Sequence, residues 1–297
     1  MTQPPFGLLN VHKPAGLSSR KVVDRVARIV RPAKAGHAGT LDPLATGVLI
    51  VCVGRATRLI AFVQELPKAY RARFVLGRTS PTDDVSGEIT EHPGAADVAR
   101  AEIEALLPQF TGRIAQVPPQ FSAVHVAGQR AYQRARRGET VELAPRTVVV
   151  HRLSLAAFEP PEFELDIECG SGTYVRSIGR DIGARLGCGA VMQSLVRTRV
   201  GPYRLDEAVP LDDLDARPLD DMLLPAVSAV GLLPAYHAAA ADLDAIRHGR
   251  RLAVPDAEQF EDGANVAVIA PDGELACVAV FDASRPALAP SHVFVAG

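Results

Sequence analysis

The hydrophobic segments of this chain are short, and most have the length of a single β-strand. The run 48–53, VLIVCV, is the most apolar of them, whereas a membrane-spanning helix needs roughly 20 such residues. Residues 69–77 alternate between apolar and polar types, as a half-buried strand does. In 19–30 the apolar residues recur instead at helical spacing, behind a capping serine at 18 or 19. Further strands are expected at 7–13, 147–158, 162–169 and 191–200, and further helices at 97–107 and within 170–187.

Strands and helices alternate without the even rhythm of βαβ units, which favours an α+β fold. Residues 205–234 are rich in Pro and Asp and are predicted to be a linker with a short helix. The remaining residues carry short strand patterns separated by Asp-Gly turns, which are typical of a small β-rich domain. Two domains are therefore predicted, at 1–232 and 233–297.

The composition excludes several classes of protein. A hydrophobic fraction of 47% with 22% charged residues is ordinary for a globular chain and excludes disorder. The four cysteines, at 52, 169, 188 and 277, form no CxxC pair, which argues against a zinc site and a disulfide framework. The N-terminus lacks a basic region followed by a long apolar core, so no secretory signal is expected. These features predict a cytoplasmic protein without a metal site.

The charges are unevenly distributed along the chain. Residues 1–78 contain 13 Lys or Arg against 3 Asp or Glu, whereas residues 205–297 contain 5 against 16. A basic body beside an acidic tail suits a polyanion such as nucleic acid, although Arg-rich solvated helices give similar counts. The acidic loop 79–91 is expected to lie away from any RNA. The basic residues expected to contact phosphate lie in 20–34, 55–58 and 130–137.

A glycine-punctuated segment, 36–49 (GHAGTLDPLATGVL), leads into the most apolar run. Its glycines permit a loop that folds closely over a neighbour, and the dipeptide Asp42-Pro43 lies at its tip. Asp-Pro is also a common turn dipeptide. This segment alone therefore does not distinguish a catalytic carboxylate from a turn cap.

The same segment resembles the L-D-x-L-A-T-G motif of the TruB family of pseudouridine synthases, in which the aspartate is the essential carboxylate. Four further segments match that family in the same order, and together the matches cover residues 6–204. Agreement of five separate segments makes the resemblance specific. The further segments are 12–19 (HKPAGLSS), 68–77 (KAYRARFVLG), 170–183 (GSGTYVRSIGRDIG) and 188–203 (CGAVMQSLVRTRVGPY).

The resemblance implies a role for each matching residue. Asp42 is implied to be the catalytic carboxylate, Arg176 to pair with it, and Tyr70 to stack on the base and take part in catalysis. Substrate binding is implied for His37, Tyr70, Tyr174 and Leu195, and support of the catalytic loop for Lys13, Pro14, Gly39, Thr40 and Leu41.

The family also implies a fold and a substrate. The fold is a mixed, largely antiparallel sheet flanked by helices and loops, with an RNA-gripping insertion at about 117–146 and a PUA-like RNA-binding domain at 233–297. The substrate is uridine 55 in the T loop of tRNA, which must be flipped out of its stack. The resemblance implies a monomer that needs no cofactor, no membrane and no obligatory protein partner.

The reaction breaks a C–N glycosidic bond, turns the base and forms a C–C bond at the same sugar carbon. It involves no net redox change or hydrolysis, so it requires neither nicotinamide nor metal. It does need an anionic group at the sugar–base junction and a dry pocket. Arg176 is expected to orient Asp42 and keep it ionised. Attack on the sugar carbon, addition to the uracil ring and removal of a sugar proton all remain open as the role of Asp42.

Three alternatives are weighed against this hypothesis. A guide-RNA-dependent H/ACA-type synthase is disfavoured by the excursion at 117–146 and by a catalytic domain that begins almost directly. A non-catalytic RNA-binding protein is disfavoured because Asp42, Tyr70 and Arg176 are all present. A glycoside or nucleoside hydrolase is disfavoured because no second carboxylate lies in a matching motif.

Overall fold

The structure is a computed structural model, which describes residues 4–122, 125–126, 129–130, 134, 137, 143–254 and 257–295. About half of the insertion predicted at 117–146 lies outside the described residues. Of the basic segment predicted in 130–137, the structure describes residues 130, 134 and 137.

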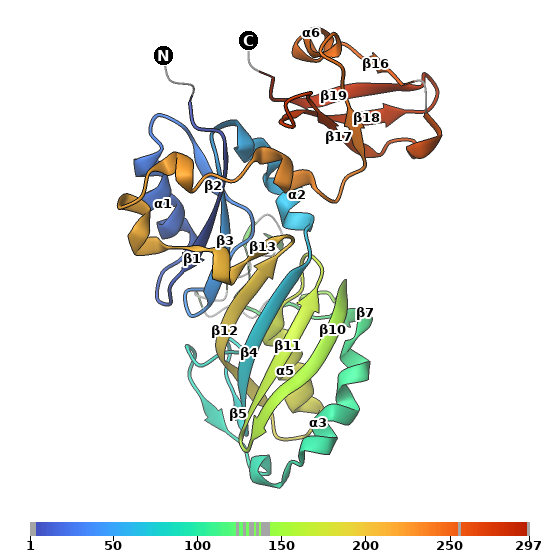
Figure 1. Cartoon of the computed structure of the whole chain (residues 1–297). Helices are drawn as coiled ribbons and strands as arrows, with labels where there is room; N and C mark the ends of the chain where they lie inside the picture. Colours follow the sequence, from blue (N-terminus) through green and yellow to red (C-terminus); the bar gives the residue numbers. More distant parts are fainter. Residues whose placement is uncertain are drawn as a thin grey trace.

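A ten-stranded mixed sheet forms the body of the molecule (Figure 1). Two pairs of strands are parallel, β1 with β14 and β3 with β12, and the other pairs are antiparallel. This confirms the predicted mixed, largely antiparallel sheet. The main path runs β14 (Val209–Pro210), β1 (Gly7–Lys13), β3 (Thr46–Val53), β12 (Ala190–Val200), β4 (Lys68–Leu76), β11 (Glu162–Cys169), β10 (Arg146–Glu159) and β7 (Gly112–Gln116), while β2 (Ala35–His37) pairs with β3 and β13 (Tyr203–Arg204) with β12.

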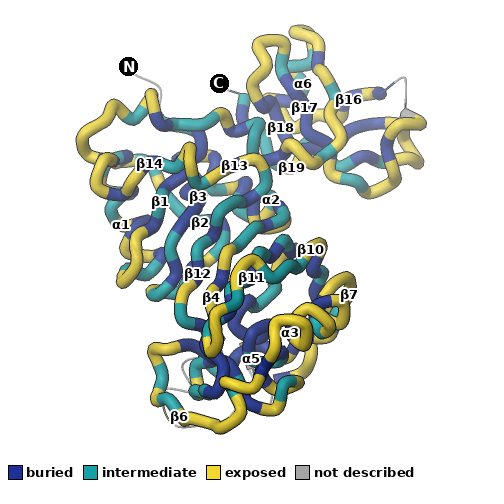
Figure 2. Tube along the Cα trace, turned by 60° about the horizontal axis from the view of Figure 1, so that its bottom comes forward, coloured by how far each residue is buried: buried dark blue, intermediate teal, exposed yellow. Residues whose placement is uncertain are grey.

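Helices cover the two halves of this sheet separately. Helix α1 (Ser19–Ile29), capped by Ser18, buries its valines in one hydrophobic cluster with residues of β1 and β3. Helix α5 (Val175–Arg185) packs behind β12 and β4, and α3 (Arg100–Leu106) lies beside it (Figure 1). Figure 2 shows α5 largely buried and α3 largely exposed. The sheet and helices therefore form two layers with separate cores on either side of the β3–β12 pair.

The core under α5 depends on a glycine in that helix. Gly179 faces the ring of Phe74 on β4, and a Cβ at this position would lie 2.0 Å from the ring. Phe74 in turn stacks on Phe163 of β11 with ring centroids 5.1 Å apart. Helix and sheet can approach this closely only because Gly179 has no side chain.

A five-stranded sheet forms a separate C-terminal unit, as the sequence predicts. Its short helix is α6 (Asp242–Arg247). The predicted fold class, an α+β body with a small β-rich domain, is confirmed. The strand order is β15 (Ala235–His237), β17 (Asn265–Ile269), β18 (Leu275–Asp282), β19 (Ala287–Val293) and β16 (Leu252–Ala253).

The C-terminal unit is docked on the body by aromatic rings and arginines. Phe6 stacks on Phe294 with ring centroids 5.4 Å apart. Arg58 donates to the Val293 carbonyl at 3.1 Å and lies over the Phe294 ring, and Arg55 lies over the Phe6 ring. Side chains of both sheets share one hydrophobic cluster, among them Leu8, Val48 and Val200 of the large sheet and Ile269, Leu275 and Val278 of the small one.

Two segments differ from the sequence expectation. Residues 54–65, for which no element was predicted, form the 3₁₀ helix η1 (Gly54–Leu59) and helix α2 (Ile60–Glu65). The predicted linker is packed against the body, because several of its apolar residues join the cores. It contains the 3₁₀ helices η4 (Leu205–Glu207), η5 (Leu211–Asp215), η6 (Leu219–Asp221) and η7 (Ala226–Val230).

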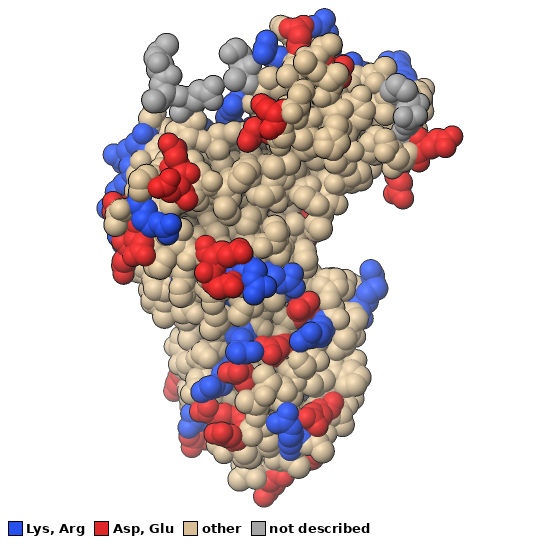
Figure 3. Space-filling view, in the orientation of Figure 1, with Lys and Arg blue, Asp and Glu red and all other residues tan. Residues whose placement is uncertain are grey.

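Part of the basic N-terminal segment is neutralised within the fold. Arg25 of α1 pairs with Asp215 at 2.7 Å and with Asp212 at 3.1 Å. Over the body, Lys and Arg alternate with Asp and Glu in Figure 3. None of the helices in the described part of the chain is long and apolar enough to cross a membrane.

Candidate active site

The loop that carries Asp42 connects β2 to β3 and is held by the end of β1. Lys13, fully buried, donates from Nζ to the carbonyl oxygens of Pro14 at 2.9 Å, Pro43 at 3.3 Å and Ala45 at 2.6 Å. Burial lowers the pKa of Lys13 to about 8, while the charge of Asp42 acts to raise it. A buried lysine thus fixes the backbone on the C-terminal side of Asp42.

The N-terminal side of the loop is held by the start of α1. Ser19 Oγ accepts from the Leu41 N–H at 2.8 Å and donates to the Leu41 carbonyl at 3.1 Å. The Gly16 N–H, in the exposed turn that begins at Pro14, donates to the Pro43 carbonyl at 2.8 Å. The HKPAGLSS segment therefore contacts the catalytic loop on both sides of Asp42.

Arg176, near the start of α5, reaches Asp42 from the other half of the sheet. Its Nε lies 3.1 Å from Asp42 Oδ2. The guanidinium is buried, and it also donates to the carbonyl oxygens of Thr82 at 2.7 Å and Phe121 at 3.1 Å. Three different loops are therefore joined through this one side chain.

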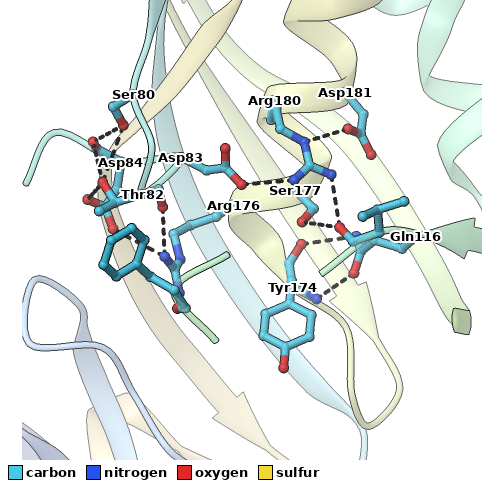
Figure 4. Close-up of polar contacts among 12 residues, drawn as sticks. Ser80, Thr82, Asp83, Asp84, Gln116, Tyr174, Arg176, Ser177, Arg180 and Asp181 are labelled. Atoms are coloured by element: carbon cyan, nitrogen blue, oxygen red, sulfur yellow. Dashed lines mark hydrogen bonds and ion pairs between the residues drawn. The ribbon is translucent and has the colours of Figure 1, made fainter. Parts of the chain in front are cut away.

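The acidic loop 79–91 places two carboxylates next to arginines of α5 (Figure 4). Asp84 Oδ2 is 3.6 Å from Arg176 Nη1, and Asp83 Oδ2 is 2.9 Å from Arg180 Nη1. Asp84 also accepts from Thr82 Oγ1 at 2.8 Å. Both carboxylates are buried and are compensated by arginines of α5.

A glutamine side chain joins β7 to the turn before α5. Gln116 donates to the Tyr174 carbonyl at 3.0 Å and accepts from the Tyr174 N–H at 2.7 Å, and both bonds are visible in Figure 4. Ser177 and Arg180 each donate to the Val117 carbonyl, at 3.0 and 2.9 Å. The segment before residue 122 is thereby fixed to the start of α5.

A second buried arginine, Arg197 of β12, lies under the catalytic loop. It donates to the carbonyl oxygens of Val48 at 2.7 Å, Gly39 at 3.1 Å and Thr40 at 3.4 Å. Its backbone pairs with Gly47, where a Cβ would lie 2.2 Å from the Arg197 carbonyl oxygen and φ is 105°. Only glycine permits this approach.

These elements enclose a cavity of about 440 Å³. Most of the predicted site residues meet there: Asp42, Tyr70, Tyr174, Arg176 and Leu195, with Gly39, Thr40 and Leu41 of the loop. Lys13, Pro14 and His37 do not line it. The remaining lining residues are Gln64, Lys68, Phe121, Ser122, Gly170, Ser171, Gly172, Thr173, Val175 and Arg197.

Burial raises the pKa of Asp42 above its ordinary value. Arg176 lowers it, Asp84 raises it further and Lys13 lowers it. The pKa is raised on balance because the loss of hydration outweighs the attraction of Arg176. Arg176 therefore offsets part of the cost of an ionised Asp42 and does not cancel it.

Two further predicted residues have perturbed environments. Burial raises the pKa of Tyr70, and the charge of Arg197 acts against this rise. His37 is half-buried, its Nδ1 has no partner in the described structure, and burial lowers its pKa. These shifts favour a neutral phenol at the cavity wall and a neutral imidazole at the end of β2.

The residues of the site that were not predicted from the sequence include Lys68, Asp84, Ser122 and Arg197. Two of them could have been found from strand alternation, since Lys68 precedes Tyr70 by two residues and Arg197 follows Leu195 by two. Among the described residues, no group of three or more His, Cys, Asp and Glu side chains could hold a metal ion.

Two family models cover most of the chain. Residues 27–175 match the N-terminal domain of TruB family pseudouridylate synthase. Residues 176–231 match the C-terminal domain of tRNA pseudouridylate synthase B. The ion pair of Asp42 and Arg176 joins the two matched segments. These matches define the class of the protein, a pseudouridine synthase.

Similar proteins of known name indicate which pseudouridine synthases the chain resembles. The chain is 43% identical over 281 residues to tRNA pseudouridine synthase B of Thermobifida fusca (strain YX), a match that covers 92% of this chain and 94% of that protein. It is 47% identical over 214 residues to the protein of the same name from Gloeobacter violaceus, which covers 71% and 73%. The chain belongs to the TruB family of pseudouridine synthases.

Solved structures share its architecture. A Cbf5-Nop10-Gar1 complex contains a chain that is 27% identical with a TM-score of 0.77, and the match covers 98% of this chain and 85% of that one. An H/ACA RNP bound to a substrate RNA contains one that is 25% identical with a TM-score of 0.75, covering 98% and 86%. Both matches extend over the C-terminal sheet, which neither family model includes.

Proposed function

We propose that this protein converts uridine 55 in the T loop of tRNA to pseudouridine, with Asp42 as the catalytic carboxylate. The observation that carries the proposal is the ion pair between Asp42 and Arg176 at the wall of a 440 Å³ cavity. A cavity of this size accommodates one nucleoside. The names of the relatives supply the RNA class, tRNA.

Asp42 has the properties that the reaction demands of its anion. Its side chain is 38% exposed, toward the cavity, whereas that of Arg176 is 7% exposed. The carboxylate can therefore meet a ribose while its partner stays fixed by two backbone carbonyls. Such preorganisation reduces the reorganisation needed when charge develops on the sugar.

The detached base must stay in the cavity until it has turned. Tyr70, Tyr174 and Leu195 supply apolar walls, which exclude water from the intermediate. Tyr70 offers a ring face on which the flipped base can stack, and stacking offsets part of the few kcal/mol that flipping costs. His37 is proposed to enter the space that the base leaves.

Replacing Asp42 by Asn tests the proposal. The variant keeps the shape of the side chain and removes the anion, so pseudouridine formation on an unmodified tRNA transcript should fall below detection while RNA affinity stays near that of the wild type. The free energy of unfolding is measured alongside, to exclude loss of the fold. Product formation near the wild-type rate would rule out Asp42 as the catalytic group.

Replacing Tyr70 by Phe separates stacking from proton transfer. The ring is kept, so RNA affinity should be unchanged, whereas product formation should slow if the hydroxyl helps to deprotonate C5 of the base. Single-turnover rates on the same transcript measure the effect. An unchanged rate would restrict Tyr70 to stacking.

The H/ACA-type alternative is favoured by one observation, the similarity to a chain in an H/ACA RNP. The higher identity to proteins named tRNA pseudouridine synthase B weighs against it. We propose an enzyme of the cytoplasm that acts as a monomer, without guide RNA or an obligatory protein partner, and whose residues 233–297 form a PUA-like RNA-binding domain beside a catalytic domain at 1–232. Activity of the purified chain alone on a tRNA transcript separates the two alternatives.

A further inference from the structure

A lysine that the proposed chemistry does not use lines the cavity. Lys68 begins β4 and lies on the same face of the strand as Tyr70, since the two are separated by one residue. Both side chains line the cavity. Lys68 is only 7% exposed, so its ammonium group has lost most of its hydration.

The contacts of Lys68 within the described structure do not compensate its charge. Nζ donates to the carbonyl oxygen of Gln64, and no carboxylate among the described residues lies within ion-pair distance of it. Burial is the largest cause that lowers the pKa of Lys68, to about 8, and the charge of Arg197 on β12 lowers it further. The titratable groups that act in the opposite direction are Cys169 of β11 and Glu65 of α2.

A buried ammonium with one neutral acceptor is costly, because buried charges in proteins are normally paired. Such a group in a ligand cavity marks a position that a ligand completes. An anion would supply the missing charge and acceptors for the two remaining N–H groups. The geometry therefore favours an anionic part of the substrate next to Lys68.

The position of Lys68 indicates which part of a nucleotide this is. Gln64, whose carbonyl Lys68 contacts, is exposed, so this side of the cavity is its mouth. Two residues of a strand span about 6.6 Å, which separates Lys68 from Tyr70 along β4. A nucleotide whose base stacks on Tyr70 carries its phosphodiester toward the mouth, where the RNA backbone continues.

We propose that Lys68 binds a backbone phosphate adjacent to the target uridine. The proposal rests on the proposed function, since it requires an RNA substrate with one nucleotide in the cavity. Lys68 is thus a substrate-binding residue that fixes the depth at which the flipped nucleotide stops. The ammonium becomes paired only when RNA is bound.

The test measures RNA affinity against salt concentration. All proteins carry Asp42→Asn to prevent turnover, and the probe is an unmodified T-arm stem-loop transcript. Lys68→Met should bind about tenfold more weakly at low salt, as expected for loss of one charge-assisted contact. The slope of log affinity against log salt should fall by about 0.7 to 0.9, the value of one phosphate contact.

Two control variants are compared with Lys68→Met. Lys68→Arg keeps the cation and should keep the salt slope. Arg73→Met removes a cation from the same strand but from its opposite, exposed face, and should leave both affinity and slope unchanged. Should Lys68→Met fail to fold, Lys68→Gln enters the same comparison.

The outcomes distinguish failure of the Lys68 phosphate contact from failure of the proposed function. Unchanged affinity and slope in Lys68→Met, with tight binding by the parent, would overturn the phosphate contact alone. A lowered melting temperature with unchanged binding would mean that Lys68 is structural, which also overturns it. Failure of the wild-type enzyme to modify the transcript would instead refute the proposed function.

Discussion

Strand β4 carries cationic side chains on both faces, but they are buried on one face and exposed on the other. On the face toward the cavity, Lys68 and Tyr70 are largely removed from water. On the opposite face, Arg71 pairs with Asp166 at 2.9 Å and Arg73 with Glu164 at 3.4 Å, all on neighbouring antiparallel strands. The exposed arginines are 54% and 49% accessible.

Burial therefore affects the pKa of a charged group, and its importance for activity and stability, more than pairing does. Exposed pairs gain little because water solvates the separated ions almost as well. Buried charges lose their hydration, which shifts their pKa values in the direction of the neutral form, and fixed groups of opposite charge offset part of that shift. Each prediction below changes a charge on one of these two sides of the sheet.

The largest effect is expected for Arg176→Met, on the buried side. Its loss leaves Asp42, Asp84 and two carbonyl groups without their cation. Misplacing the carboxylate should lower single-turnover pseudouridine formation by at least about 100-fold. The free energy of unfolding should fall by about 3 to 5 kcal/mol, as when one partner of a buried pair is removed.

Arg176→Lys is the control for charge without geometry. A lysine keeps the cation but cannot contact the carboxylates and both carbonyls from one planar group. We expect an activity between those of the wild type and of Arg176→Met. Wild-type activity in Arg176→Met would show that Asp42 does not need its buried partner, and it would contradict the greater importance of the buried charges.

A smaller effect is expected on the pH dependence of the reaction. Asp42 must be ionised to act, and its pKa is raised, so activity should be lost as the pH falls through a value above the ordinary aspartate pKa of about 3.9. The charge of Asp84 contributes to this rise. Asp84→Asn should therefore move the acid limb of kcat/KM to lower pH, and a shift to higher pH would contradict the assignment.

The smallest effect is expected on the exposed side. Arg71→Ala removes one of the exposed ion pairs between β4 and β11. The free energy of unfolding should change by no more than about 1 kcal/mol. Turnover should match that of the wild type, because Arg71 points away from the cavity. Urea unfolding and the tRNA assay measure both, and a large loss of activity would mean that the outer face serves the reaction.

The sequence predicts the site residues that belong to local motifs better than those that act through distant partners. The loop with Asp42 and the turn before Arg176 could be recognised because both belong to glycine-containing motifs with fixed local spacing. Their approach to 3.1 Å across the sheet agrees with the pairing that the motifs imply. Strand positions were also predicted well, since apolar runs and alternation are local properties.

The groups that were missed act through partners distant in the chain. Arg197 contacts carbonyl oxygens about 150 residues away, at Val48 and Gly39, and its alternation with Leu195 indicates its face of the strand but not these partners. Asp84 belongs to the acidic loop 79–91, which was expected to lie away from any RNA. Its approach to within 3.6 Å of Arg176 depends on tertiary contacts, which composition alone does not indicate.

The junction between the two sheets limits how the C-terminal unit can be studied. Apolar side chains from both sheets share one cluster, and Phe6 is covered by Phe294. A protein shortened to residue 232 would open this cluster to water, and its lower RNA affinity would reflect a damaged scaffold. Point substitutions on exposed residues of α6, which contributes no residue to this cluster, avoid that ambiguity because they leave the cluster closed.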